Sequence, residues 1–239
     1  QTGARSVAFT YNDPVIFLEY AVDTAIACHE RDIKTVAVTA GYIAEGAREE
    51  FFQHIDAANV DLKAFTEDFY WKLTGGHLDD VLDTLKYLKH ETEVWFELTT
   101  LVIPGKNDSD EEFREMAAWV VNELGSEVPM HFTAFHPDYK MTDIPPTPID
   151  TLLRARDIVL QSGIEYVYVG NIPDRKSNST WCPQCNHLLI ERQAYQMGRW
   201  GLNADGHCEK CGHAIPGVFE PKPGDWGSRR MPIRMDRSY

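Results

Sequence analysis

Hydrophobic residues along most of this chain follow one of two spacings. Short β-branched runs predict strands, and longer runs with apolar residues every three or four positions predict helices between them. The predicted strands are Ser6–Tyr11, Thr35–Thr39, Asn59–Ala64, Val94–Ile103, Met130–Phe135 and Tyr166–Val169. The predicted helices are Pro14–Arg31, Glu45–Ile55, Asp79–Lys89, one opened by Ser109 and Glu112 as a capping box, and Thr147–Gly163. Strands separated by single helices indicate βαβ units, and therefore a parallel sheet that closes fully or partly into a barrel.

The C-terminal part of the chain has a different pattern. Residues 178–219 contain two Cys-x-x-Cys pairs and little helical periodicity, and residues 220–239 are rich in Pro, Gly and Arg. We therefore expect an α/β barrel domain over residues 1–177, a small metal-binding ribbon over 178–219 and a flexible tail over 220–239.

Composition and charge narrow the class of protein. The 239 residues are 43% hydrophobic, which is enough for a packed core, and their formal net charge is -14. This charge disfavours binding to nucleic acid or to an anionic membrane, because both need a basic surface. No apolar run approaches the ~20 residues of a membrane-spanning helix, and no signal peptide is visible. Four of the five cysteines form Cys-x-x-Cys pairs, which in a reducing compartment indicates metal ligation, so we expect a cytoplasmic protein.

Unusual residues, all but one of them polar, lie where five of the predicted strands end. They are Asn12 and Asp13, Thr39 and Gly41, Asp61 and Lys63, Thr99 and Thr100, and His136. In α/β barrels this end of the strands carries the active site. Polar side chains on one face of several strands need partners, and a charged ligand would supply them.

Each residue also has a simpler interpretation. Asp13 suits a helix N-cap, and Gly41 suits a tight turn between a strand and a helix. Asp61 and Lys63 suit an ion pair at a strand end. His136 suits a surface turn. The functional interpretation therefore depends on the joint order and placement of these residues.

Four longer strings carry a resemblance to one enzyme family. They are Val7–Pro14, Val38–Tyr42, Asn59–Phe65 and His131–Pro137. In sequence and order they resemble the radical SAM protein of the AmmeMemoRadiSam system, a family related to pyruvate formate-lyase activating enzymes. The cysteine pairs also fit the C-terminal extension of that family. The resemblance covers Ser6 to about Phe219 and implies a partial TIM-like (β/α)6 barrel with a C-terminal extension.

The resemblance implies that the strand ends bind S-adenosylmethionine. Tyr11–Asp13 stands where activating enzymes have a Gly-Gly-Glu element that holds the amino group, although its first two residues are bulkier than glycine. Asp61 and Lys63 match an Asp-x-Lys element that contacts the ribose and carboxylate side, and His136 matches a histidine of the last strand. The predicted cofactor-binding residues are Tyr11, Asn12, Asp13, Thr39, Gly41, Asp61, Lys63 and His136.

The chemistry that the resemblance implies also needs a [4Fe-4S] cluster held by three cysteines. With it, S-adenosylmethionine is cleaved reductively to a 5′-deoxyadenosyl radical that abstracts hydrogen from a substrate. No Cys-x-x-x-Cys-x-x-Cys motif is present, and Cys28 is interpreted as a core residue of a helix. Because the chain begins at Gln1, we expect an N-terminally truncated enzyme that is inactive alone. The substrate is open, with a protein as one candidate, and the implied partners are companion proteins of the system and an electron donor.

The two cysteine pairs predict a metal site of their own. Cys182 and Cys185 are separated from Cys208 and Cys211 by 22 residues, and each pair can present two thiolates to one ion. The alternatives are two pairs of redox-active thiols or unpaired cysteines. A tetrahedral four-sulfur site suits zinc and iron equally. We expect a structural zinc ribbon, with a rubredoxin-like iron or an auxiliary iron–sulfur cluster as the alternative.

Two other functions remain open at this point. A non-catalytic barrel with a zinc ribbon could act as an adaptor for partner proteins, and it predicts no cysteine triad upstream. A metal-dependent TIM-barrel hydrolase is disfavoured because few ligands are suitably placed, namely Asp13, Asp61 and His136.

Overall fold

The computed structural model describes residues 3–224 and 227–232 of the chain. The chain divides into two compact units, Gln1–Ile172 and Pro173–Tyr239. In the predicted tail, residues 225–226 and 233–239 lie outside the described residues. No described helix combines the length and the apolar character that spanning a bilayer requires.

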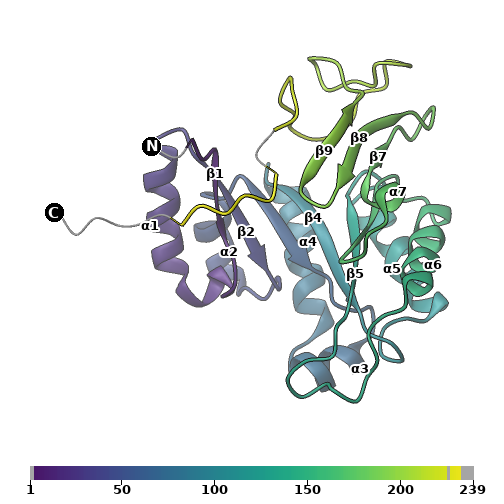
Figure 1. Cartoon of the computed structure of the whole chain (residues 1–239). Coiled ribbons are helices and arrows are strands. Elements are labelled where there is room, and N and C mark those ends of the chain that lie inside the picture. Colours follow the sequence, from purple (N-terminus) through teal and green to yellow (C-terminus); the bar gives the residue numbers. More distant parts are fainter. Residues whose placement is uncertain (1–2, 225–226, 233–239) are drawn as a thin grey trace. The chain divides into compact units, whose positions relative to one another are not determined.

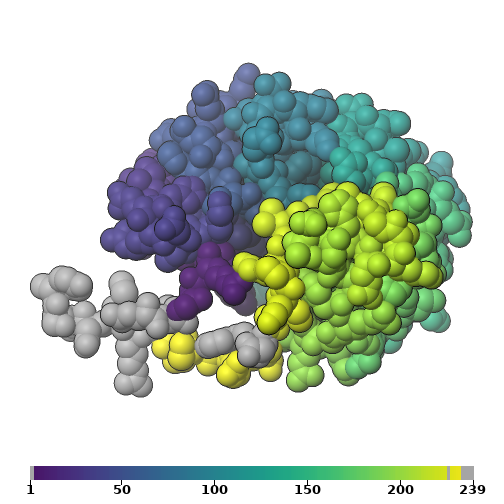
Figure 2. All heavy atoms as spheres, turned by 90° about the horizontal axis from the view of Figure 1, so that it is seen from above, coloured from purple at the N-terminus to yellow at the C-terminus, as the bar shows by residue number. Residues whose placement is uncertain are grey.

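The first unit is built on a parallel sheet whose strand order is β1-β2-β3-β4-β5-β6. Its strands are β1 (Ser6–Phe9), β2 (Lys34–Thr39), β3 (Ala57–Asp61), β4 (Trp95–Val102), β5 (Met130–Ala134) and β6 (Val167–Gly170). Its helices are η1 (Pro14–Phe17), α1 (Leu18–His29), α2 (Glu45–Phe52), α3 (Glu67–Phe69), the π-helix η2 (Tyr70–Thr74), α4 (Leu78–Glu91), α5 (Asp110–Glu123) and α6 (Ile149–Gln161). Strands that follow one another along the chain are neighbours in the sheet, and the helices lie in the connections from one strand to the next (Figure 1). Seen from above, the successive segments of this unit follow an arc in chain order (Figure 2). The predicted α/β fold, a partial (β/α)6 barrel, is confirmed.

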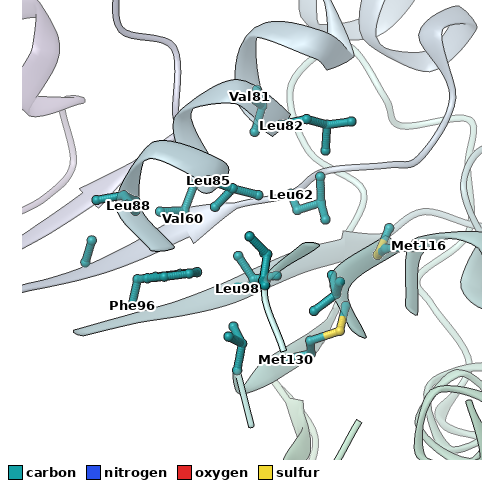
Figure 3. Close-up of a cluster of buried hydrophobic side chains, with 14 of the residues drawn as sticks. Val60, Leu62, Val81, Leu82, Leu85, Leu88, Phe96, Leu98, Met116 and Met130 are labelled. Atoms are coloured by element: carbon teal, nitrogen blue, oxygen red, sulfur yellow. The ribbon is translucent and has the colours of Figure 1, made fainter. Parts of the chain in front are cut away.

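Alternation along the strands decides which face of the sheet is buried. In β4, Phe96 and Leu98 are buried, and Glu97 between them is partly exposed. The buried face packs against helices, and Figure 3 shows Leu85 of α4 beside Val60 of β3. A strand with period two thus meets the apolar stripe of a helix with period 3.6, which gives one continuous core. On the opposite face, β4 and β5 carry polar side chains, among them Glu97, Thr99 and His131.

Two predicted helix starts differ from the observed ones in detail. Ser109 caps α5, because its hydroxyl oxygen accepts a hydrogen bond from the N–H of Glu112 at 3.2 Å. The Glu112 carboxylate does not complete a capping box, since it accepts from the N–H of Phe65 at 2.7 Å instead. Thr147 lies before α6, which begins at Ile149. Its hydroxyl joins the end of β4 to the segment after β5.

The second unit combines a short helix with a small antiparallel sheet in the order β7-β8-β9. Its elements are α7 (Arg175–Asn178), β7 (Thr180–Trp181), β8 (Leu188–Gln193) and β9 (Gln196–Trp200). The sequence pattern did not predict these strands. All four cysteines of the Cys-x-x-Cys pairs belong to this unit.

Candidate functional site

The loops after β1 and β2 are held together by the carboxylate of Asp13. The hydroxyl of Thr39 donates to both of its oxygens at 2.9 and 3.0 Å, and the N–H of Ala40 donates to Oδ2 at 2.7 Å. The N–H of Val15 donates to Oδ1 at 3.1 Å, so the N-cap interpretation of Asp13 is confirmed. The same carboxylate therefore caps η1 and fixes the end of β2. This arrangement gives the backbone before Asp13 one defined course.

Tyr11 shows why a glycine-containing element fits the place before Asp13. Its φ is 70°, in the left-handed region that glycine adopts without penalty and that residues with a β-carbon avoid. Its side chain is 100% exposed, so packing does not compensate for this conformation. The backbone therefore keeps the course that a glycine would allow, although the sequence has tyrosine.

Gly41 is required by close packing as well as by its backbone. Its φ is 77°, and a β-carbon at this position would lie 3.1 Å from side-chain carbons of both Val60 and Val81. Its amide N–H also donates to the hydroxyl of Thr39 at 3.1 Å. Gly41 thus lets the loop after β2 approach the core closely.

Asp61 and Lys63 meet at the end of β3, as the sequence predicts. The Nζ atom of Lys63 lies 2.6 Å from Oδ2 of Asp61, and the two side chains are 33% and 34% exposed. The predicted strand Asn59–Ala64 was too long, because β3 ends at Asp61 and Lys63 belongs to the irregular segment that follows. The ammonium group is nonetheless directed back to the strand end. A cation held by one carboxylate and still open to solvent can receive an anionic ligand group.

A polar row crosses four neighbouring strands beside this pair. Asp61, Thr99, His131 and Tyr168 are register partners on β3, β4, β5 and β6. The ring of His131 stacks on Tyr168 with centroids 5.0 Å apart. Its Nε2 lies 2.6 Å from Oε2 of Glu97, whose side chain is partly exposed. The face of the sheet opposite the helices therefore carries titratable and aromatic groups.

Sequence reasoning did not single out His131 or Tyr168 as site residues. The available signal was alternation, since His131 and Thr133 flank the buried Phe132 in β5. Their pairing with β4 and β6 depends on the register of the strands, which the sequence pattern alone does not give.

His136 lies in the segment after β5, at the same end of the sheet. Its side chain is 77% exposed, and Nδ1 lies 3.0 Å from Oδ2 of Asp138. This environment matches a polar surface turn. A role of His136 toward a cofactor stays a prediction.

A groove of about 610 Å³ lies at the other end of the sheet. It includes Asp56, which precedes β3, and Val94, which precedes β4. Glu49, Glu91 and Glu93 also line it, so it is strongly acidic. This groove is therefore separate from the strand-end residues and does not suit an anionic ligand.

The four paired cysteines converge on one point. The sulfur atoms of Cys182, Cys185, Cys208 and Cys211 all lie within 4.8 Å of one another. The Sγ–Sγ distances are 3.6 Å for Cys182 and Cys211 and 3.7 Å for Cys185 and Cys208. A tetrahedral ion with bonds of about 2.3 Å to sulfur needs sulfur atoms about 3.8 Å apart. This four-cysteine site therefore has the dimensions of a tetrahedral four-sulfur metal site.

Both knuckles use the same backbone turn. The N–H of Asn186 donates to the carbonyl of Cys182 at 2.8 Å, and the N–H of Gly212 donates to the carbonyl of Cys208 at 2.9 Å. Asn186 and Gly212 have φ values of 53° and 76°, which asparagine and glycine tolerate best. Each Cys-x-x-Cys pair is thus shaped locally by the residue that follows it.

The thiol pKa values in this cluster diverge. Burial raises the pKa of Cys182, and it raises the pKa of Cys185 to about 12. Burial also acts on Cys208, but hydrogen bonds from the backbone N–H groups of Cys211 and Lys210 outweigh it and lower the pKa of Cys208 to about 7. Since thiolates are the metal ligands, loading an ion here must release protons.

Comparison with curated proteins finds relatives among activating enzymes. An uncharacterized protein of Methanocaldococcus jannaschii is 38% identical over 210 residues, which are 87% of this chain and 62% of that protein. The 4-hydroxyphenylacetate decarboxylase activating enzyme of Clostridioides difficile is 25% identical over 70% of this chain and 55% of its own length. The pyruvate formate-lyase-activating enzyme of Clostridium pasteurianum is 29% identical over 58% of this chain and 61% of its own length. The chain thus spans 55–62% of the length of these relatives.

Solved structures share the fold. A domain of the pyruvate-formate lyase-activating enzyme from Bacteroides vulgatus aligns with a TM-score of 0.61 over 71% of this chain and all of that chain, at 14% identity. A radical SAM methyltransferase from Sphaerobacter thermophilus aligns with a TM-score of 0.57 over 69% of this chain and 50% of that chain, at 18% identity. The model of the Radical SAM superfamily matches residues 1–120, half of the chain. The chain is therefore a member of the radical SAM superfamily, related to the pyruvate formate-lyase activating enzymes.

Proposed function

We propose that this chain is the S-adenosylmethionine-binding part of a radical SAM enzyme of the AmmeMemoRadiSam type. The observation that carries the proposal is the Lys63–Asp61 pair at the carboxyl end of β3, next to the loops that Asp13 and Thr39 fix. Lysine and carboxylate groups at this end of an α/β barrel suit a ligand with both a carboxylate and an ammonium group. Superfamily membership supports the same ligand.

Each predicted residue has a task in this proposal. Lys63 binds the carboxylate of S-adenosylmethionine, and Asp61 orients Lys63 or accepts from a ribose hydroxyl. The backbone of Tyr11 and Asn12 lies near the amino group. Asp13 acts mainly by holding this backbone in place, because donors of both loops already bind its carboxylate. The remaining predicted contacts to the ligand are Thr39, Gly41 and His136.

The residues present do not provide for an iron–sulfur cluster. When bound, a [4Fe-4S] cluster supplies the electron for reductive cleavage of S-adenosylmethionine to the 5′-deoxyadenosyl radical. Four of the five cysteines of this chain belong to the four-cysteine site, and the fifth, Cys28, is buried in α1. We propose that a Cys-x-x-x-Cys-x-x-Cys motif lies in sequence upstream of Gln1, and that the chain needs this segment for activity. The relatives are longer than the part they share with this chain.

Sequencing the coding DNA upstream of Gln1 tests directly whether the proposed cysteine motif is present there. An in-frame Cys-x-x-x-Cys-x-x-Cys motif is the expected result. A start codon close to Gln1 with no such motif would overturn the enzyme proposal. It would favour instead a barrel with a metal ribbon that acts as an adaptor between proteins.

Binding of S-adenosylmethionine to the complete protein tests the role of Lys63. We expect Lys63→Ala to weaken binding at least tenfold, because a charged hydrogen bond to the ligand is lost (on the order of 1.5–3 kcal/mol). Lys72→Ala is the matched control, since Lys72 forms an exposed ion pair with Asp68 on the surface of the same unit. Equal affinities of the Lys63 variant and the wild type would reject the assignment.

For the substrate and the partners, we propose only the class of molecule. The related activating enzymes are named for the enzymes they activate, which supports hydrogen abstraction from a protein. We propose companion proteins of the same system and an electron donor as partners, and the cytoplasm as the location. Crosslinking in cell extracts with and without S-adenosylmethionine would identify a protein substrate, and turnover of a small molecule by the complete enzyme alone would contradict this part.

We further propose that the four-cysteine site holds zinc in a structural role. Four thiolates at tetrahedral spacing in a unit with a small sheet support an ion that replaces a large core. Metal analysis with absorption spectroscopy separates the alternatives. One zinc per chain and no visible absorption are expected. A coloured protein with one iron would indicate a rubredoxin-like centre, and iron with acid-labile sulfide an auxiliary cluster.

A further inference from the structure

The segment that follows β3 carries Lys63 without being part of a strand. Residues 62–66 belong to no helix or strand, so their backbone groups need partners other than a strand ladder. Side chains from other segments provide these partners. The bonds join Thr100 Oγ1 to the carbonyl of Leu62 (2.7 Å), the N–H of Lys63 to the hydroxyl of Tyr70 (3.0 Å), Asn107 Nδ2 to the carbonyl of Lys63 (2.6 Å), and the N–H of Phe65 to Oε1 of Glu112 (2.7 Å).

Asn107 is the member of this set that joins two strand ends. Its Nδ2 donates to the carbonyl of Lys63 at 2.6 Å and to the carbonyl of Leu101 at 2.9 Å, and its Oδ1 accepts from the N–H of Ile103 at 2.7 Å. The residue is 1% exposed. Both amide hydrogens and the amide oxygen of this buried residue therefore have partners, and the orientation of the amide is determined by two carbonyls on one side and an N–H on the other.

This geometry sets the direction of the Lys63 side chain. The carbonyl and the N–H of Lys63 are both fixed, by Asn107 and by Tyr70, so the Cα–Cβ bond of Lys63 has one direction. Burial raises the pKa of Tyr70, so its hydroxyl stays neutral near pH 7. The long side chain keeps rotational freedom, but it starts from a fixed base and ends 2.6 Å from Asp61.

We infer that Asn107 is a positioning residue for the ligand site, acting through the backbone of Lys63. It binds no ligand atom itself. It holds the segment after β3 against the loop after β4, so that the ammonium group of Lys63 reaches the end of the sheet. The inference rests on the proposed function, because it presumes that Lys63 binds the carboxylate of S-adenosylmethionine.

The test measures equilibrium binding of S-adenosylmethionine to the complete protein. We expect Asn107→Ala to weaken binding about tenfold, as loss of one well-placed hydrogen bond would. We expect Asn107→Asp to weaken binding similarly. Its carboxylate still accepts from the N–H of Ile103 but has no hydrogen to donate to the carbonyl of Lys63. The two variants together separate anchoring of the loop from positioning of Lys63.

A double variant distinguishes positioning from a general structural role. If Asn107 acts through Lys63, then Lys63→Ala combined with Asn107→Ala binds no more weakly than Lys63→Ala alone. Multiplied losses in the double variant would overturn the inference, as would wild-type affinity of a folded Asn107→Ala or Asn107→Asp variant. Wild-type affinity of Lys63→Ala would instead mean that the proposed function of Lys63 is wrong.

Two further variants cover the case in which Asn107 variants do not fold. Tyr70→Phe removes the hydroxyl that accepts from the Lys63 N–H, and it should weaken binding by a smaller factor that disappears in the Lys63→Ala background. Wild-type affinity of Tyr70→Phe would then overturn the inference. Thr35→Val is the matched control, because Thr35 is fully buried and its hydroxyl bonds to a carbonyl at the opposite end of the sheet. It should lower stability without changing affinity.

Discussion

Tyr11 holds a conformation that is unfavourable for any residue with a β-carbon. The left-handed region costs such a residue about 1–2 kcal/mol, and the fully exposed ring gains no packing in return. The conformation persists because Asp13 binds donors on both neighbouring loops. Local strain of this kind is typical of functional sites, where the surrounding structure determines the backbone.

We therefore predict that Tyr11→Gly folds to a more stable protein than Tyr11→Ala. Alanine keeps the β-carbon and the strain, whereas glycine loses both, and the expected difference in the free energy of unfolding is about 1 kcal/mol. Urea denaturation of the two variants measures it. Equal stabilities would show that the backbone at position 11 changes its conformation when the tyrosine is replaced.

Asp56 connects three secondary-structure elements at the other end of the sheet. Its carboxylate accepts from Nζ of Lys34 at 2.6 Å and from the N–H of Thr35 at 2.8 Å, and it lies 2.8 Å from Nε2 of His29. It thus joins the end of α1, the start of β2 and the start of β3. Burial favours the neutral acid, but the hydrogen bonds from Lys34, Thr35 and His29 outweigh burial and hold the pKa of Asp56 well below its usual 3.8.

We predict that Asp56→Asn lowers the free energy of unfolding at pH 7 by about 2 kcal/mol, because charged hydrogen bonds are lost. The unfolded chain takes up a proton near pH 3.8 and the folded chain does so only at lower pH. The contribution of Asp56 is therefore complete only above about pH 5, and it is lost progressively as the pH falls through 3.8 toward the lower folded-state pKa. Acid unfolding curves should consequently be flatter for the variant.

The control for this prediction is Asp23→Asn, which changes an exposed carboxylate on α1. The stability of this variant at pH 7 and the low-pH part of its acid unfolding curve should match those of the wild type. If the stability of Asp56→Asn fell with decreasing pH as steeply as that of the wild type, the linkage between Asp56 and acid unfolding would be contradicted.

The strands and the longer helices of the first unit follow from its hydrophobic pattern, but the short helices η1 and α3 and the end of β3 do not. Alternation continues from Val60 to the buried Leu62, so the sequence predicts a strand to Ala64. The strand stops earlier because partners distant in sequence take its backbone groups, above all Asn107. The π-helix η2 likewise has no signal in the pattern.

The candidate sites differ in how far sequence predicts them. The spacing of the cysteines alone predicts the four-cysteine site, since each pair is shaped within its own turn. The sequence also predicts the contact between Asp61 and Lys63, because the two residues are close in sequence. The Glu97–His131 pair joins two strands separated by α5, and only their register brings it together.

At the scale of the whole molecule, the four-cysteine site and the barrel belong to different units of the chain. We predict that Cys182→Ser releases the ion and increases amide hydrogen exchange across the second unit. Exchange in β1–β6 should stay unchanged, because the first unit has its own buried core. Metal analysis with hydrogen-exchange mass spectrometry measures both effects. Full retention of the ion would reject the four-sulfur assignment.

Cys28→Ala is the reciprocal control. Cys28 is buried in α1 of the first unit. Its replacement should lower the stability of that unit by about 1 kcal/mol through a small cavity. The metal content should stay at the wild-type value.

The repeated turn in the two cysteine knuckles also has a kinetic consequence. Since each pair is arranged by its own turn, an ion can be held by one knuckle before the other closes. During release, a knuckle that detaches stays tethered by the 22 residues between the pairs, at an effective concentration on the order of millimolar. Recapture then competes with escape. Exchange of the ion should therefore be slow in the absence of a chelator. It should become faster when a chelator is present that is small enough to bind the half-released ion.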